Sequence, residues 1–333
     1  RRSSDLKARG FVETGIYYPA VAYENDFARL FPQTKFDIVI DFSGYSYSWG
    51  SLLLGGRATQ SIAWQHNDIL ADSQRMVGDT FIHRVNVEPL ISIYSKFDKL
   101  VSVSPVLRDL NYKNLSQYYG NAIPESARNT INVDKILERS LKQRLFPKMP
   151  KRDMFGELLP KFNKRATNFV TMGRLSPEKN QLFLIDAFKA YTEKYDSNAR
   201  LYLLGQGPLA EALKEKIESN NLSQQVFMLG HNTTPHLLMR QMDVFVLPSL
   251  YEGQPMVLLE ALTLNMKVMA SDIPQNAYVL GFGDLGLLKD GTSVNEFVNG
   301  LDTINRANKN DFNKFDPYKY NDDAVLDFYE VLK

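Results

Sequence analysis

The feature that most constrains this fold is a regular alternation of short apolar runs with longer amphipathic segments. In the second half, runs rich in β-branched and aromatic residues predict buried strands at residues 168–172, 200–204, 226–229, 244–247 and 267–270. Helical spacing predicts helices between them, at residues 177–195, 209–220, 235–241 and 255–264. This order is typical of a parallel sheet with helices on both faces.

The first half repeats the pattern less regularly. Residues 36–42, 61–65 and 99–104 predict strands, and a helix is expected around residues 88–97. A chain of 333 residues is long enough for two domains, each with its own core. We therefore predict an α/β protein built from two doubly wound, Rossmann-like domains, which bind ligands at the carboxyl ends of their strands.

A basic, proline-containing segment marks the expected domain boundary. Residues 134–165 carry far more Lys and Arg than Asp and Glu, and they include Pro147, Pro150 and Pro160. We interpret this segment as a solvated connection; the alternative is a basic face that meets an anionic acceptor or a membrane surface. The predicted parts are an N-terminal domain at 1–150, a C-terminal domain at 151–315 and a closing amphipathic helix at 316–333.

Composition excludes several classes of protein. The formal net charge of +1 argues against a nucleic-acid binder that relies on bulk positive charge. The absence of cysteine excludes disulfides, thiolate zinc sites and cysteine nucleophiles, and four histidines make a multi-histidine metal centre improbable. No apolar run reaches the roughly 20 residues that span a bilayer, and the polar residues 1–5 do not resemble a signal peptide. We expect a cytoplasmic protein. Since the chain starts without Met, an excised portion of a longer polypeptide is one interpretation.

The first motif lies where a predicted strand ends and a predicted helix begins. It reads Gly173-Arg174-Leu-Ser176-Pro177-Glu-Lys179, in which Ser and Pro suit the N-cap and the first helical position. A helix N-terminus attracts anions, and the two cations would add charge at the same place. The motif therefore predicts a diphosphate site; if it stood alone, a capped surface helix with two solvated cations would be favoured.

The second motif follows the predicted strand at 244–247. Glu252 lies in the loop and Glu260 in the next helix, with Gly253 and Pro255 near the helix start. A carboxylate that accepts hydrogen bonds from two neighbouring hydroxyls binds a ribose selectively. Glu260 is surrounded in the sequence by Val, Leu and Ala, so an ionised group there needs a partner. The alternative, a turn residue and a helix-surface charge, is less favoured.

Together the pairs Gly-Arg-x4-Lys and Glu-x7-Glu resemble the retaining family-4 glycosyltransferases of the GT-B fold, over about residues 167–280. The resemblance implies two domains facing across a cleft. It also implies that Arg174 and Lys179 neutralise the donor diphosphate, that Glu252 lies by the donor sugar and that Glu260 binds the ribose, with no metal or other cofactor. It places further donor contacts at Gly173, Gly205, Gly207, Ser249, Gly253, Gln254 and Pro255.

In the first half, the resemblance also points to His66, in the segment Trp-Gln-His-Asn-Asp that ends a predicted strand. In the family a similar His lies near the donor sugar, which implies a catalytic role for His66 beside Glu252, Arg174 and Lys179. A lone His after a strand is otherwise usually structural. The family's first strand and glycine-rich loop are not found, because Gly10 and Gly15 are too sparse for that role.

The expected function is therefore the transfer of a hexosyl group, with retention, from a nucleoside-diphosphate sugar (UDP by family frequency) to a hydroxyl of a glycan, cell-wall polymer or protein. A weaker resemblance points to the bacterial cell-surface polymer branch, of the teichoic acid type, which would add peripheral contact with the inner face of the membrane. The main alternative is a non-catalytic GT-B-like partner subunit. A nucleotide-dependent oxidoreductase is disfavoured because no Gly-x-Gly-x-x-Gly follows a first strand.

Overall fold

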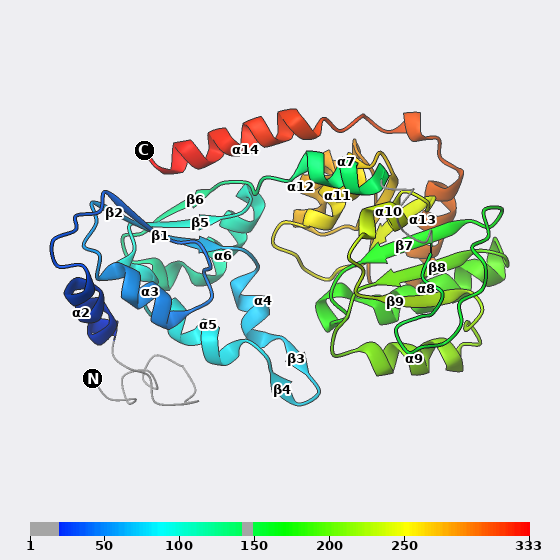
Figure 1. Ribbon diagram of the computed structural model, residues 1–333, viewed down its shortest axis with the longest axis horizontal. Helices are drawn as coiled ribbons and strands as arrows, with labels where there is room; N and C mark the ends of the chain where they lie inside the picture. Colours follow the sequence, from blue (N-terminus) through cyan, green and yellow to red (C-terminus); the bar gives the residue numbers. More distant parts are fainter. Residues whose placement is uncertain (1–19, 142–148) are drawn as a thin grey trace. The chain divides into compact units, whose positions relative to one another are not determined.

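The structure is a computed structural model that describes residues 20–141 and 149–333; Gly10, Gly15 and Pro147 lie outside the described residues. The chain forms two compact units (Figure 1). Unit 1 combines the residues up to Asn129 with Asp323–Lys333, and unit 2 is Thr130–Asp322. No helix in the described ranges is long and apolar enough to cross a membrane.

Unit 2 contains a six-stranded parallel sheet in the order β12-β11-β10-β7-β8-β9. The chain runs from β7 through β8 to β9 in one direction and then continues from β10 through β11 to β12 on the other side of β7. The strand order therefore reverses between β7 and β10, as in doubly wound sheets. The strands are β7 (Asn168–Met172), β8 (Arg200–Leu204), β9 (Val226–Gly230), β10 (Val244–Leu247), β11 (Lys267–Ser271) and β12 (Leu287–Lys289).

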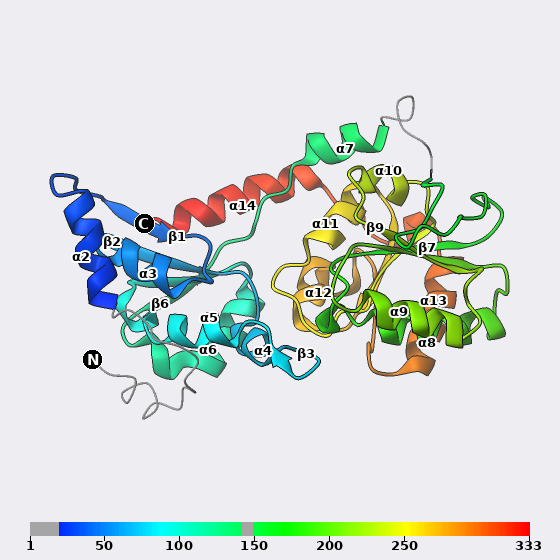
Figure 2. The same ribbon diagram turned by 60° about the horizontal axis from the view of Figure 1, so that its bottom comes forward.

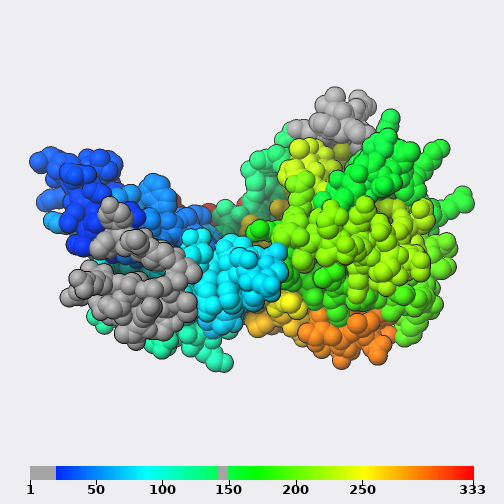
Figure 3. All heavy atoms as spheres, turned by 90° about the horizontal axis from the view of Figure 1, so that it is seen from below, coloured from blue at the N-terminus to red at the C-terminus, as the bar shows by residue number. Residues whose placement is uncertain are grey.

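Helices cover both faces of this sheet, as Figure 2 shows. One face packs against α8 (Gln181–Lys194), α9 (Ala210–Ser219) and α13 (Val294–Arg306). The other packs against α7 (Val133–Leu141), α10 (Pro235–Met239), α11 (Met256–Thr263) and α12 (Pro274–Val279). Because both faces are covered, strands such as β10 are buried along their whole length, which explains their continuous apolar sequence. Figure 3 shows α9 and α13, in yellow-green and orange, on the outer surface of unit 2.

Unit 1 contains a four-stranded parallel sheet whose order, β1-β2-β5-β6, follows the sequence. Right-handed crossovers that all proceed in one direction place their helices on one face. The strands are β1 (Ile38–Asp41), β2 (Gln60–Gln65), β5 (Lys99–Ser102) and β6 (Ile123–Ser126), with a small hairpin of β3 (Met76–Val77) and β4 (Thr80–Phe81). The helices are α2 (Ala20–Leu30), α3 (Tyr47–Leu54), α4 (Ile69–Gln74), α5 (Arg84–Ile91) and α6 (Pro105–Tyr119).

The second face of the unit 1 sheet is covered by the end of the chain. Helix α14 (Pro317–Val331) begins in unit 2 and ends in unit 1, where Phe328 and Val331 pack with Trp64 and other residues of β2 and β5. The Arg128 guanidinium donates to both carboxylate oxygens of Asp327, at 2.6 and 3.0 Å. The closing helix expected from the sequence therefore begins near the predicted residue. Its last turns complete the hydrophobic core of unit 1, which is otherwise built from the N-terminal part of the chain.

The structure differs from the sequence-based expectations in two ways. Helix α7 packs against α10 and α11, so the units divide between Asn129 and Thr130 and not near residue 150. The helix expected around residues 88–97 ends at Ile91, and a separate 3-10 turn follows at Tyr94–Lys96. The short 3-10 helices of unit 2 are Pro177–Lys179, Gly281–Gly283 and Lys309–Asp311.

Candidate functional site

The candidate site of unit 2 lies at the carboxyl ends of β7 and β10, where the strand order reverses. The loop after β7 carries Arg174 and Lys179, and the loop after β10 carries Glu252. A backbone hydrogen bond of 2.8 Å from Leu250 N–H to the Glu178 carbonyl joins the two loops. Both sequence motifs therefore meet at one edge of one sheet, which is where such folds bind ligands.

Lys179 and Glu252 form an ion pair, with 2.6 Å between Nζ and Oε1. The hydroxyl of Ser249 donates to the same carboxylate oxygen at 2.7 Å. The Lys179 side chain retains 19% of its exposure and that of Glu252 only 9%, so the carboxylate is largely desolvated and depends on these donors. Lys179 also passes close to Gly173, where an added Cβ would lie 3.6 Å from the lysine side chain.

A pocket of about 340 Å³ opens at the ends of β7, β8 and β9. We call it the strand-end pocket; it is lined by Met172, Gly173, Arg174, Leu204, Gly205, Gln206, Gly230, His231, Asn232 and Pro235. Its size lies within the range of small-ligand sites, about 300–1,000 Å³. Arg174 and His231 are exposed there, so the border of the pocket includes one permanent cation.

The two glycines after β8 are required by close contact between loops. Gly205 has φ +143°, and a Cβ there would lie 1.8 Å from the Gly173 carbonyl oxygen. A Cβ at Gly207 would lie 2.3 Å from the Leu175 carbonyl oxygen. The Leu175 N–H donates to the Gln206 carbonyl at 3.0 Å, so this loop supports the loop that carries Arg174. Gly207 itself lies outside the lining of the pocket.

The α-helix expected to begin at Ser176 and Pro177 starts there only as a short 3-10 turn. The Ser176 hydroxyl bonds to Glu178 at 2.6 Å and caps no helix, and Pro177–Lys179 is one 3-10 turn. Asn180 then adopts a left-handed conformation (φ 55°), and α8 starts only at Gln181. Pro255 similarly precedes α11 as its N-cap residue. The cations therefore sit on a turn before α8, held by the bond from the Gln181 side chain to the Arg174 carbonyl at 2.8 Å.

Glu260 has the partner that its apolar sequence surroundings require. Its Oε2 accepts a hydrogen bond from Nε2 of His236, at 3.1 Å. His236 adjoins Pro235, which borders the strand-end pocket. Sequence reasoning missed His236, although a histidine directly after the proline that opens a short helix was visible. Nearby, Gln254 donates to the Tyr320 hydroxyl at 2.5 Å, a contact within unit 2 that the sequence also did not predict.

His66 lies in unit 1, directly after β2. Its Nε2 is 2.6 Å from the Phe42 carbonyl, so this nitrogen carries hydrogen and donates. Burial lowers the pKa of His66, against smaller opposing effects of that bond and of Asp41. The neutral ring therefore offers Nδ1 as an acceptor. The exposed Phe42 ring lies 5.0 Å from the His66 ring, edge to face.

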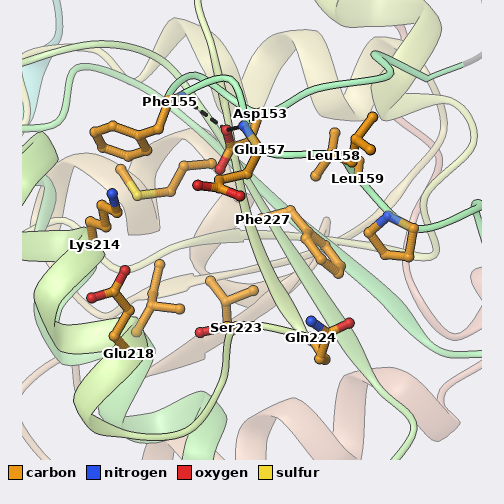
Figure 4. A pocket seen from close by; sticks show the side chains of 14 residues that line it. Asp153, Phe155, Glu157, Leu158, Leu159, Lys214, Glu218, Ser223, Gln224 and Phe227 are labelled. Atoms are coloured by element: carbon orange, nitrogen blue, oxygen red, sulfur yellow. Dashed lines mark hydrogen bonds between the residues drawn. The ribbon is translucent and has the colours of Figure 1, made fainter.

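A second pocket, of about 350 Å³, lies along the edge strand β9 (Figure 4). Phe155, Leu158 and Leu159 border it on one side and residues of α9, including Lys214 and Glu218, on another. The Asp153 carboxylate accepts the N–H groups of Phe155 and Glu157 there. None of the donor-site residues predicted from the sequence lines this pocket.

Comparison with known proteins identifies the C-terminal part. Residues 160–321 match the family described as glycosyl transferases group 1. This part of the chain therefore resembles the group 1 glycosyltransferases. A UDP-Gal:alpha-D-GlcNAc-diphosphoundecaprenol alpha-1,3-galactosyltransferase of Escherichia coli is 30% identical over 162 residues, which are 48% of this chain and 41% of that protein. A poly(ribitol-phosphate) alpha-N-acetylglucosaminyltransferase of Staphylococcus aureus is 30% identical over 102 residues, 31% of this chain and 20% of that protein.

Solved structures extend the similarity in fold to nearly the whole chain. The Anabaena Alr3699/HepE protein, crystallised in complex with UDP, has a TM-score of 0.62 and 15% identity, covering 92% of this chain and 82% of that one. The fold is GT-B, with two Rossmann-like units, as the resemblance to the family-4 glycosyltransferases predicted. The chain spans less than half the length of the two curated relatives named above.

Proposed function

We propose that this glycosyltransferase moves a hexosyl group from a nucleoside-diphosphate sugar to a hydroxyl of a glycan or cell-surface polymer, with retention and without a metal. The observation that carries the proposal is the arrangement at the edge of the unit 2 sheet. The exposed Arg174 borders a pocket of about 340 Å³, and the Lys179–Glu252 pair adjoins the same loop. The names of two relatives, one a UDP-galactose enzyme, support this donor class.

The donor's diphosphate would be held by fixed cations. Arg174 and Lys179 flank the turn after β7, and the strand-end pocket offers backbone around Gly205 and Gly230 for the nucleoside. In the structure Lys179 is bonded to Glu252, so a bound diphosphate would share the ammonium group with that carboxylate. Glu252 would remain anchored by Ser249, near the donor sugar.

The proposed chemistry needs electrostatic help at the leaving group. As the glycosidic bond breaks, positive charge grows on the sugar ring and negative charge on the diphosphate. Arg174 and Lys179 are preorganised for the second charge, which is where fixed groups lower a barrier most. The acceptor hydroxyl then attacks from the side that the diphosphate leaves, and its proton passes to a phosphate oxygen. Glu252 would stabilise the positive charge on the ring.

His66 would take a role as a hydrogen-bond acceptor. Its Nε2–H is already used by Phe42, and burial keeps the ring neutral, so only Nδ1 can meet a sugar hydroxyl. This role agrees with the position implied by the family and adds no general base. A cell-surface polymer as acceptor would suit the basic residues of the segment 149–165, such as Lys151, Arg152 and Lys161.

The test is a transfer assay on the full-length protein with a panel of UDP-, GDP- and ADP-hexoses and a soluble acceptor. We expect one nucleotide sugar to be consumed, an axial linkage from an axial donor by proton NMR of the product, and unchanged turnover in EDTA. Inverted product, or complete loss of activity with EDTA that added Mg²⁺ restores, would contradict the proposal. Arg174→Leu should lose most of the activity and Lys194→Met, on the exposed end of α8, none.

A further inference from the structure

Glu260 is held by a single side-chain contact. Its Oε2 accepts from Nε2 of His236 at 3.1 Å, and no other side chain among residues 20–141 and 149–333 bonds its carboxylate. The two residues come from neighbouring helices, α10 and α11, which both pack on the same face of the unit 2 sheet (Figure 2). Since a carboxylate can only accept, the hydrogen of the bond lies on Nε2.

The imidazole of His236 is largely buried, and only one of its two nitrogens has a hydrogen-bond partner. Its side chain is 8% exposed, against 24% for Glu260. The other ring nitrogen, Nδ1, is buried and has no hydrogen-bond partner. An apolar side chain of similar size would fill this place without an unpaired buried nitrogen, which is costly. Packing of α10 alone therefore does not account for a histidine at this position; the bond to Glu260 does.

The pair adjoins the strand-end pocket through the start of α10, although neither His236 nor Glu260 lines it. Pro235, the first residue of α10, lines that pocket, and His236 follows it directly. The bond to His236 occupies Oε2 of Glu260 and leaves Oε1 available. A side chain already held in place loses less rotational freedom when a ligand binds, so it binds more tightly.

We propose that His236 is a positioning residue that holds the Glu260 carboxylate in the orientation in which it accepts the ribose hydroxyls of the donor nucleotide. This inference rests on the proposed function, because it needs a nucleoside diphosphate in the strand-end pocket. It assigns to His236 a part in discriminating ribose from sugars that lack these hydroxyls. His236 touches Glu260 and not the reacting atoms.

The experiment compares two ligands by isothermal titration on the full-length protein. One is the nucleoside diphosphate that binds best among UDP, GDP and ADP, and the other is its 2′,3′-dideoxy analogue, which lacks both hydroxyls. The variants are His236→Phe, which fills the space without the bond, and His236→Gln, whose amide nitrogen can donate in place of Nε2. Leu238→Val is the matched control, since Leu238 is buried on the same helix and has no bond to Glu260.

We expect His236→Phe to weaken binding of the ribose nucleotide by about three- to ten-fold, the cost of ordering one free side chain. The affinity of His236→Phe for the dideoxy analogue should stay unchanged. His236→Gln should recover part of the lost affinity for the ribose nucleotide. Leu238→Val should bind both ligands with the affinities of the wild type. Equal losses for both ligands in His236→Phe, or no loss, overturn the positioning role while leaving the proposed function intact. If wild-type protein binds none of the three diphosphates, the proposed function falls, and the positioning role falls with it.

Discussion

Replacing Lys179 by Met should destabilise unit 2, because it leaves the Glu252 carboxylate without its countercharge. The Glu252 side chain is 9% exposed and that of Lys179 19%, with 2.6 Å between the charged atoms. Removing one partner of a buried ion pair costs about 3–5 kcal/mol. The Ser249 hydroxyl would still donate to Glu252, so we expect the lower end, about 3 kcal/mol.

A double-mutant cycle separates the charge from the packing. The variants are Lys179→Met, Glu252→Gln and the double variant, and the measurement is urea unfolding followed by far-UV circular dichroism. The double variant should be at least about 1 kcal/mol more stable than Lys179→Met, because it no longer buries a lone carboxylate. Lys194 is an exposed residue at the end of α8, so the control variant Lys194→Met should change the free energy of unfolding by less than about 0.5 kcal/mol. The reasoning is refuted if Lys179→Met unfolds like the wild type, or if the two single effects add.

Two further predictions concern a glycine and a histidine. Gly205→Ala should cost about 1–3 kcal/mol, because its Cβ would lie 1.8 Å from the Gly173 carbonyl at φ +143°. In thermal denaturation, Gly156→Ala, which shares a positive φ but meets nothing within 4 Å, should cost less; an equal cost would contradict the steric argument. Burial lowers the pKa of His66 in the folded chain, so the unfolded chain binds a proton at this residue at a higher pH than the folded chain does. The full contribution of the neutral His66 ring to the free energy of unfolding should therefore be present above about pH 6.5 and be lost as the pH falls below it. The stability of the wild type should fall more steeply over that range than the stability of His66→Gln. Parallel pH profiles of the two proteins would contradict this expectation.

The strands of unit 2 were predictable because each is buried on both faces and has a continuous apolar sequence. Residues 168–172 and 200–204 form β7 and β8 within the predicted bounds. Helix α13 was missed although Ser293 caps it and Glu296 lies three residues later, a recognisable start signal. Its apolar residues Phe297, Leu301 and Ile304 lie at helical spacing among polar ones.

The candidate site shows where local reasoning fails. Ser-Pro-Glu looks like a helix start, yet the Ser176 hydroxyl is engaged by Glu178 and the left-handed Asn180 delays the helix. That outcome depends on contacts of the whole loop. The need of Glu260 for a partner followed from its neighbours in the sequence. The identity of that partner, His236, depends on how α10 and α11 pack on the sheet, which brings together two residues 24 positions apart.

Titration of the full-length protein with UDP, GDP and ADP tests the central claim most directly, with Arg174→Leu as the variant. Arg174 is exposed and its side chain is not part of the hydrophobic core, so the variant should keep the unfolding temperature of the wild type. The account predicts that one nucleoside diphosphate binds the wild type and that Arg174→Leu weakens this binding at least about tenfold, the loss of a charge-assisted hydrogen bond. If no nucleoside diphosphate binds the wild type, or if Arg174→Leu binds it equally well, the account is contradicted.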